Sequence, residues 1–245
     1  MLAIVQWIRS LIFVVQMYLA MTVIGLFGAP ISLLRTNYAY AVVRLFCNYV
    51  TWSASWIIGL QTEIRGEPPS GEILIAAKHQ SFLDVIMILS KTPQPKFIMK
   101  SSLTYMPIIG FYARRIGCIP VKRGRRTEAI KTMIAAVQDG NATPGQLIIY
   151  PQGTRVTPGD QVSYKVGAAI LYEELGQPCM PVACNVGLFW GRLGIYKKSG
   201  KATIEFLPVI MPGLDRNIFL SKLEETIERR SNDLMNEVIH NTYSK

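Results

Sequence analysis

After residue 66 the chain alternates short apolar runs with segments of helical periodicity, and this alternation limits the possible folds more than any other feature. The apolar runs have strand length and lie at 73–77, 96–99, 118–121, 146–150, 180–185 and 202–210. Helical patterning is found at 81–89, 103–116, 127–138 and 165–175, and from a capping box at Ser221-x-x-Glu224 to about residue 239. Strands that alternate with helices usually form a sheet with helices on its faces. The sequence therefore predicts an α/β fold with a mixed or mostly parallel sheet flanked by helices.

The N-terminal region almost lacks charge. No charged residue occurs in residues 11–34, and Arg44 is the only one in residues 38–60. The first run is long enough to span a bilayer, although its glycines and Pro30 predict a straight helix that ends near Leu26. The second run is rich in Tyr and Trp, which favour the membrane interface. These features predict an N-terminal two-helix membrane hairpin.

This hairpin and the α/β pattern divide the chain into residues 1–65 and residues 66–245. Two other interpretations of the N-terminal region remain open. Arg9 ahead of an apolar stretch is also typical of a cleaved signal peptide, and apolar helices can belong to a soluble core. A second apolar segment that follows at once, with its paired aromatics, favours membrane attachment.

Composition supports a lipid surface as partner. Half of the residues are hydrophobic and only 17% are charged, yet the formal net charge is +10. A chain that is both apolar and basic favours an anionic membrane over nucleic acid, and neither zinc-finger spacing nor an Arg-rich tract occurs. The cysteines lack metal-ligand spacing, so we expect no metal site, no disulfide and buried thiols in a protein that faces the cytosol. They are Cys47, Cys118, Cys179 and Cys184.

His79 follows the apolar run 73–77, at the kind of strand end where α/β proteins place their chemistry. Asp84 comes five residues later, and within one regular helix the two side chains would point about 140° apart. They can meet if His79 precedes the helix and Asp84 lies in its first turn, as a Ser81-x-x-Asp84 capping box would arrange. Asp84 would then fix the imidazole tautomer and leave the other nitrogen free as a base. The alternative is a simple helix cap beside a hydrogen-bonded polar residue.

Cations follow two further expected strands. Lys122-Arg123-Gly124-Arg125-Arg126 comes after the run 118–121, and Gln152-Gly153-Thr154-Arg155 comes after the run 146–150. The planar guanidinium group matches phosphate oxygens, and glycine permits close backbone approach. A base and two arginines at one sheet edge would suit a phosphate ester that carries a hydroxyl. The alternative for Lys122 to Arg126 is a solvated basic turn or a patch for anionic lipid, and for Arg125 and Arg126 it is at least as good an interpretation.

Several common catalytic motifs are missing from the sequence. No G-x-S-x-G elbow supports a hydrolase serine, no G-x-G-x-x-G supports dinucleotide binding, and the spacing from Gly194 to Lys201 does not fit a P-loop.

Four segments together resemble the sequence blocks of the glycerolipid acyltransferases, and most nearly the 1-acylglycerol-3-phosphate (lysophosphatidic acid) acyltransferases. In order they are His79-x₄-Asp84, Gly117 to Arg123, Pro151-Gln152-Gly153-Thr154-Arg155 and Met180-Pro181-Val182-Ala183. The resemblance covers residues 73–209, and the N-terminal region is similar to the two-helix membrane motif of bacterial members.

The resemblance implies transfer of a fatty acyl group from acyl-CoA or acyl carrier protein to the hydroxyl of a lysophospholipid, giving phosphatidic acid, with no further cofactor and no acyl-enzyme. His79 would be the general base and Asp84 would orient it. Arg123 and Arg155, helped by Lys100, would hold the acceptor phosphate, and Gly153 and Thr154 would shape that site. The expected location is a membrane, at the cytoplasmic face of a bacterial inner membrane.

One position departs from the family pattern, because Gln152 stands where the third block usually has Glu. Glutamine cannot serve as an acid or base, so acceptor preference does not carry over directly. The acceptor could instead be another lysophospholipid or a lyso-aminolipid. A hypothesis from a different class is a non-catalytic lipid-binding membrane protein, which would have no need of a base; a hydrolase would leave Arg123 and Arg155 without their clearest purpose.

Overall fold

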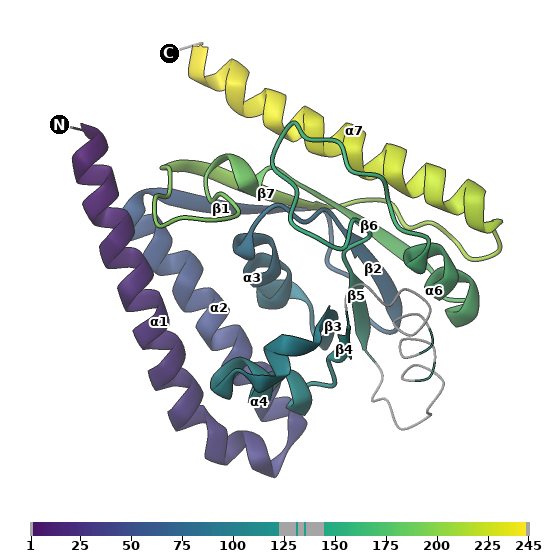
Figure 1. Cartoon of the computed structure of the whole chain (residues 1–245), viewed down its shortest axis with the longest axis horizontal. Helices are drawn as coiled ribbons and strands as arrows, with labels where there is room; N and C mark the ends of the chain where they lie inside the picture. Colours follow the sequence, from purple (N-terminus) through teal and green to yellow (C-terminus); the bar gives the residue numbers. More distant parts are fainter. Residues whose placement is uncertain (1, 123–130, 132–134, 136–144, 244–245) are drawn as a thin grey trace.

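A single seven-stranded sheet lies at the centre of the molecule, in the order β1-β7-β6-β2-β5-β3-β4 (Figure 1). The computed structural model describes residues 2–122, 131, 135 and 145–243. The strands β6, β2, β5, β3 and β4 run parallel to one another, whereas β7 and β1 run in the opposite direction. Their bounds are β1 Leu60–Arg65, β2 Ile73–Ala77, β3 Pro95–Lys100, β4 Ile119–Val121, β5 Gln146–Ile149, β6 Cys179–Cys184 and β7 Gly200–Phe206. This arrangement confirms the predicted mixed, mostly parallel sheet.

Helices cover both faces of the sheet, which explains why the central strands are continuous apolar runs. Every residue of β2 and of β6 is buried. Alternate residues of β2 point to opposite faces, with Ile75 in the core beneath α1, α2 and α3, and Leu74 in the core beneath α6 and α7. The helices are α1 Leu2–Leu34, α2 Thr36–Ile58, α3 Phe82–Lys91, α4 Pro107–Arg115, α6 Gly167–Leu175 and α7 Arg216–Tyr243, with short 3₁₀ turns at Ser101–Tyr105 and Val186–Leu188.

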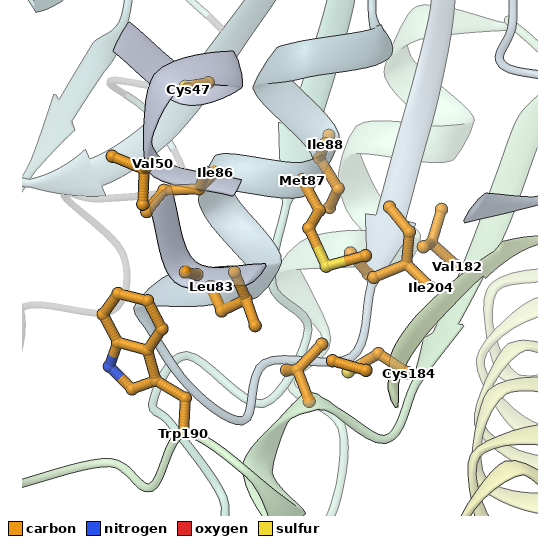
Figure 2. Close-up of a cluster of buried hydrophobic side chains, with 14 of the residues drawn as sticks. Cys47, Val50, Leu83, Ile86, Met87, Ile88, Val182, Cys184, Trp190 and Ile204 are labelled. Carbon is orange, nitrogen blue, oxygen red and sulfur yellow. The ribbon is translucent and has the colours of Figure 1, made fainter. Parts of the chain in front are cut away.

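The helix α3 is packed between α2 and the sheet, and this packing fixes the place where β2 ends. Figure 2 shows the side chains of Leu83, Ile86 and Met87 between those of α2 and those of β6 and β7. Leu83 and Met87 are fully buried. Burying side chains of this size contributes about 1.5–3 kcal/mol each. The short loop from β2 into α3, which carries His79, is therefore held at both ends by buried structure.

The helices α1 and α2 lie side by side, as Figure 1 shows. However, the prediction that the first helix ends near Leu26 is wrong, because α1 continues to Leu34 with Pro30 inside it. The two glycines are contact points and not breaks. A Cβ at Gly25 would lie 2.5 Å from Ile108 of α4, and one at Gly28 would lie 2.6 Å from Val42 of α2. The glycines thus let α1 approach its neighbours closely.

Among the described residues, α1 is the one helix long and apolar enough to cross a membrane, over Ala3–Leu34 with a mean hydropathy of 2.1. Many of its apolar side chains are exposed, for example Leu19 at 61% and Phe27 at 82%. The second helix, with 23 residues, is long enough but is not apolar enough to meet the same criteria. The sequence prediction of two membrane helices is therefore supported for the first helix only.

One further boundary and one whole strand differ from the prediction. The last helix begins at Arg216 and not at Ser221, because the Asp215 carboxylate accepts a hydrogen bond from the Asn217 backbone at 2.8 Å and thereby caps an earlier start. The sequence analysis does not predict β1, because it places residues 60–65 in the hairpin. These residues instead pair with β7 throughout and form the edge of the sheet.

Other segments agree with prediction to within a few residues, apart from the helix expected at 103–116. That segment forms a 3₁₀ turn and then α4, separated at Met106. The expected helix over residues 127–138 lies outside the described residues, except for Lys131 and Ala135. The proposed division of the chain into residues 1–65 and 66–245 stays a prediction.

Candidate active site

His79 and Asp84 form a buried pair at the carboxyl end of β2. The imidazole Nδ1 lies 2.8 Å from Asp84 Oδ1, and the two side chains are 11% and 1% exposed. The other carboxylate oxygen, Oδ2, accepts hydrogen bonds from the backbone N–H groups of Gln80 and Ser81, both at 2.8 Å. Oδ2 thus accepts two hydrogen bonds from the backbone. Because a carboxylate oxygen can only accept, the imidazole Nδ1 carries the proton and donates it to Oδ1. This tautomer leaves the Nε2 lone pair free.

The predicted capping box produces this geometry. Ser81 is the N-cap of α3 in an extended backbone conformation, and its hydroxyl accepts a hydrogen bond from the Leu83 N–H at 2.9 Å. Asp84 is the third residue of the helix and binds back to the N-cap backbone. Since Ser81 is fully buried and used as a cap, it is not placed as a nucleophile.

Tyr150, immediately after β5, stacks on His79, a contact that sequence inspection missed. The two rings are 3.9 Å apart at their centroids with an interplanar angle of 19°. Burial raises the pKa of the Tyr150 hydroxyl well above its usual value, and the charge of Asp84 raises it further. An aromatic residue at the end of a neighbouring strand was the only available signal, and it is a common feature of buried strands.

The segment after β5 holds the backbone of the β2 loop. Val156 N–H donates to the His79 carbonyl at 2.8 Å, and the Lys78 N–H donates to the Val182 carbonyl of β6 at 2.9 Å. Gly153 adopts a left-handed conformation with φ of 67°, and a Cβ there would lie 2.5 Å from the Lys165 amine. Glycine is thus needed both for the turn and for the close approach of a cation.

Arg155 lies in this segment and is partly exposed. Its guanidinium donates to the Arg192 carbonyl at 3.2 Å, and its charge lowers the pKa of Tyr150, the smallest of the effects on that hydroxyl. Arg155 therefore lies within electrostatic range of the ring that stacks on His79. Thr154, next to it, is half-buried.

The remaining predicted site residues are less completely defined. Lys100 ends β3 at the same edge of the sheet and is exposed, and no hydrogen bond joins it to His79 or Arg155 within the part of the chain that the structure describes. Arg123, with Arg125 and Arg126, lies outside the described residues. The roles assigned to all of these residues stay predictions.

Gln152 does not belong to the face occupied by His79. It is 1% exposed, and its amide nitrogen lies 3.3 Å from the Val162 carbonyl and 3.4 Å from Glu228 of α7. Its carbonyl oxygen is without a hydrogen-bond partner in the described part of the chain. The polar partners of Gln152 thus lie towards α7.

The cysteines are free thiols, three of them buried and Cys118 partly so. Burial raises the pKa of Cys118 to about 11 and that of Cys184 well above its usual value. Because the thiolate is the reactive form, none of these groups is activated as a nucleophile. Within residues 2–122 and 145–243, no group of three or more His, Cys, Asp or Glu side chains is arranged to hold a metal ion.

The fold and the site together define an α/β enzyme with a histidine–carboxylate pair at the carboxyl edge of its sheet. A family model described as Acyltransferase matches residues 61–185, so the chain belongs to the acyltransferase family.

Curated relatives and a solved structure are consistent with this assignment. The chain is 25% identical over 239 residues to the 1-acyl-sn-glycerol-3-phosphate acyltransferase of Pseudomonas aeruginosa, covering 96% of this chain and 93% of that one. It is 28% identical over 174 residues to the chloroplastic enzyme BAT2 of Brassica napus, covering 67% of this chain and 48% of the relative. The crystal structure of PlsC, the 1-acyl-sn-glycerophosphate acyltransferase of Thermotoga maritima, matches with a TM-score of 0.76 at 19% identity, covering 93% and 97% of the two chains. The last likeness shows that the two proteins share a fold.

Proposed function

We propose that this enzyme transfers a fatty acyl group from acyl-CoA or acyl carrier protein to the free hydroxyl of 1-acylglycerol-3-phosphate, giving phosphatidic acid. The observation that carries the proposal is the 2.8 Å contact between His79 Nδ1 and Asp84 Oδ1, which leaves Nε2 free at the edge where Arg155 also lies. The names of the curated relatives support this choice of acceptor.

In the proposed reaction His79 Nε2 takes the proton of the acceptor hydroxyl as its oxygen attacks the thioester carbon. The new ester bond forms as the carbon–sulfur bond breaks, and the imidazolium returns the proton to the leaving thiolate. Asp84 stabilises the charged imidazolium in between. General base catalysis of this kind contributes about 10²–10⁴-fold to a rate. Direct transfer agrees with the inactive, protonated thiols and with the capping role of Ser81.

Arg155 would bind the acceptor phosphate, with Lys165 close to the Gly153 backbone as a second cation. An arginine pairs with phosphate through two parallel hydrogen bonds. This pairing strengthens binding of the acceptor and also orients its glycerol group. Lys100 and Arg123 are proposed to add to the same site. Thr154 would contribute to its shape.

The acceptor can be another lysophospholipid without any change in the chemistry at His79. A pure lipid-binding protein is the alternative from a different class, and the His79–Asp84 pair argues against it. Binding alone has no use for an imidazole whose tautomer is fixed by a buried carboxylate.

We further propose that α1 attaches the enzyme to the membrane from which it takes its acceptor, at the cytoplasmic face of a bacterial inner membrane. The long apolar helix and its exposed side chains support attachment. The net charge of +10 suits an anionic lipid surface.

The test is to offer the purified protein a panel of lysolipids with acyl-CoA and acyl carrier protein donors and to identify products by mass spectrometry. We expect phosphatidic acid, and we expect His79→Ala to lose about 10²–10⁴-fold in rate. The matched control is His240→Ala, which changes the only other histidine, an exposed residue in the last turns of α7. Undiminished activity in His79→Ala would exclude the mechanism, and no product from any lysolipid would favour the binding protein.

A further inference from the structure

A polar cluster behind the strand ends is centred on Glu228 of α7. The Lys78 ammonium donates to both carboxylate oxygens of Glu228, at 2.7 and 2.6 Å. The Tyr164 hydroxyl donates to one of these oxygens at 2.9 Å, and the Gln152 amide reaches the same oxygen at 3.4 Å. Lys78 is 4% exposed and the Glu228 side chain is 27% exposed. Because an unpaired charge at such a depth is very unfavourable, Lys78 strongly favours the backbone arrangement that keeps Glu228 in contact.

Each partner of Glu228 directly precedes a residue of the candidate active site. Lys78 is followed by His79, Gln152 is followed by Gly153, and Tyr164 is followed by Lys165. One carboxylate from the C-terminal helix therefore joins the loop after β2, through Lys78, to two points of the loop between β5 and α6, through Gln152 and Tyr164.

Burial of the cluster makes these connections rigid. Burial raises the pKa of the Tyr164 hydroxyl above its usual value, and the adjacent Glu228 charge raises it further, so the hydroxyl stays protonated and remains a donor. Hydrogen bonds to an ionised acceptor are roughly twice as strong as neutral ones. The cluster thus restrains the relative positions of the loops after β2 and β5.

The same geometry explains why an uncharged amide is suitable at position 152. The Gln152 amide nitrogen donates towards a Glu228 oxygen that already accepts from Lys78 and Tyr164. A carboxylate at position 152 would place two negative charges beside one lysine. The negative charge that balances Lys78 is therefore supplied by α7 and not by the loop itself.

We infer that Glu228 is a positioning residue for the acyl transfer. Through Lys78 and Gln152 it holds the loop after β2, which carries His79, in register with the loop after β5, which carries Arg155. This inference rests on the proposed function, because it assigns His79 and Arg155 their roles. Glu228 acts through other residues, so its loss changes how the acceptor is held while the thioester donor is affected less.

The experiment measures kcat and KM separately for lysophosphatidic acid and for the acyl donor in the full-length enzyme. Glu228→Gln is expected to raise the KM for the acceptor about 10- to 100-fold, because the loops that hold the acceptor are misplaced, with the donor KM changed less than about threefold. The matched control is Glu225→Gln, which makes the same substitution at an exposed position of α7 and is expected to behave like the wild type.

Two double variants keep the test decisive if the single variant unfolds. Lys78→Met with Glu228→Leu removes both charges together, a change that buried pairs often tolerate in stability. It is expected to fold and still to show the raised acceptor KM. The exchange variant, Gln152→Glu with Glu228→Gln, places the carboxylate at position 152 and the amide at position 228. Because these two side chains lie 3.4 Å apart in the wild type, we expect the acceptor KM to improve at least about tenfold over that of Glu228→Gln.

Thermal unfolding of each variant sets a common assay temperature below all transitions. Wild-type kinetics in the folded Lys78→Met/Glu228→Leu variant would overturn the inference, as would an equal rise in the KM values of acceptor and donor, or no recovery in the folded exchange variant. An inactive wild type would instead refute the proposed function, so the two failures are distinguishable.

Discussion

The imidazole of His79 stacks on the ring of Tyr150 at an interplanar angle of 19°, with centroids 3.9 Å apart, while its Nδ1 is bound to Asp84. The two contacts restrain different motions. The Asp84 carboxylate sets the tautomer of the imidazole and prevents the ring from rotating within its own plane. The stacked ring of Tyr150 prevents the imidazole from tilting out of that plane. A base that is held in both ways needs little reorganisation when the acceptor hydroxyl arrives.

Removing the stacked ring should therefore slow the chemical step. We expect Tyr150→Leu to lower kcat about tenfold or more with little change in either KM, because stacked pairs contribute about 0.5–1.5 kcal/mol and misplaced groups lose rate steeply. Tyr150→Phe keeps the ring and should retain kcat to within about threefold. Steady-state kinetics of the two variants check this, and equal losses in both would assign the effect to the hydroxyl instead of the ring.

The two members of the capping box should separate stability from catalysis. Ser81→Ala removes the cap on Leu83 and should lower the free energy of unfolding by about 0.5–2 kcal/mol, while kcat stays near the wild-type value. Asp84→Asn removes the charge that stabilises the imidazolium and one acceptor for backbone N–H groups. It should lower both stability and kcat, the latter by about 100-fold or more.

Chemical denaturation and single-turnover kinetics on the same samples measure the two effects. If Ser81→Ala reduced kcat as strongly as Asp84→Asn, the helix start itself and not the carboxylate would be the important element.

The sequence was sufficient for the local part of this site and for the class of the fold. The offset from His79 to Asp84 predicts their contact because both residues lie within one helix start, whose capping geometry follows local rules. The apolar runs predict the central strands because a parallel sheet covered on both faces needs such runs.

The missed features depend on contacts between distant segments. Lys78 and Glu228 are 150 residues apart in the chain, and nothing near either residue indicates the other. The edge strand β1 depends on pairing with β7, whose residues are likewise far away in sequence. From the sequence alone Gly25 and Gly28 indicate a break in the helix, because their packing role is visible only when α4 and α2 lie against α1.

Arg155 should matter for the acceptor more than for the donor. We expect Arg155→Ala to raise the KM for lysophosphatidic acid about 10- to 100-fold, since hydrogen bonds to charged groups contribute about 1.5–3 kcal/mol. The donor KM should change little. The matched control is Arg192→Ala, which removes an equal charge from the adjacent exposed loop. Equal effects on acceptor and donor would contradict the phosphate role.

Polar substitutions on the exposed side of α1 should weaken membrane binding. Leu19 and Val23 are 61% and 52% exposed, and each charged residue at the centre of an inserted helix costs about 2.5–3.5 kcal/mol. The variant Leu19→Asp/Val23→Asp should therefore lose most of its co-sedimentation with anionic phospholipid vesicles.

Its matched control, Ile218→Asp/Ile239→Asp, makes the same change in charge at exposed positions of α7 and should bind like the wild type. If both variants lost binding equally, charge would be responsible and α1 would not be the attachment site. If neither lost binding, α1 would lie outside the lipid and the acceptor would have to reach His79 without its help.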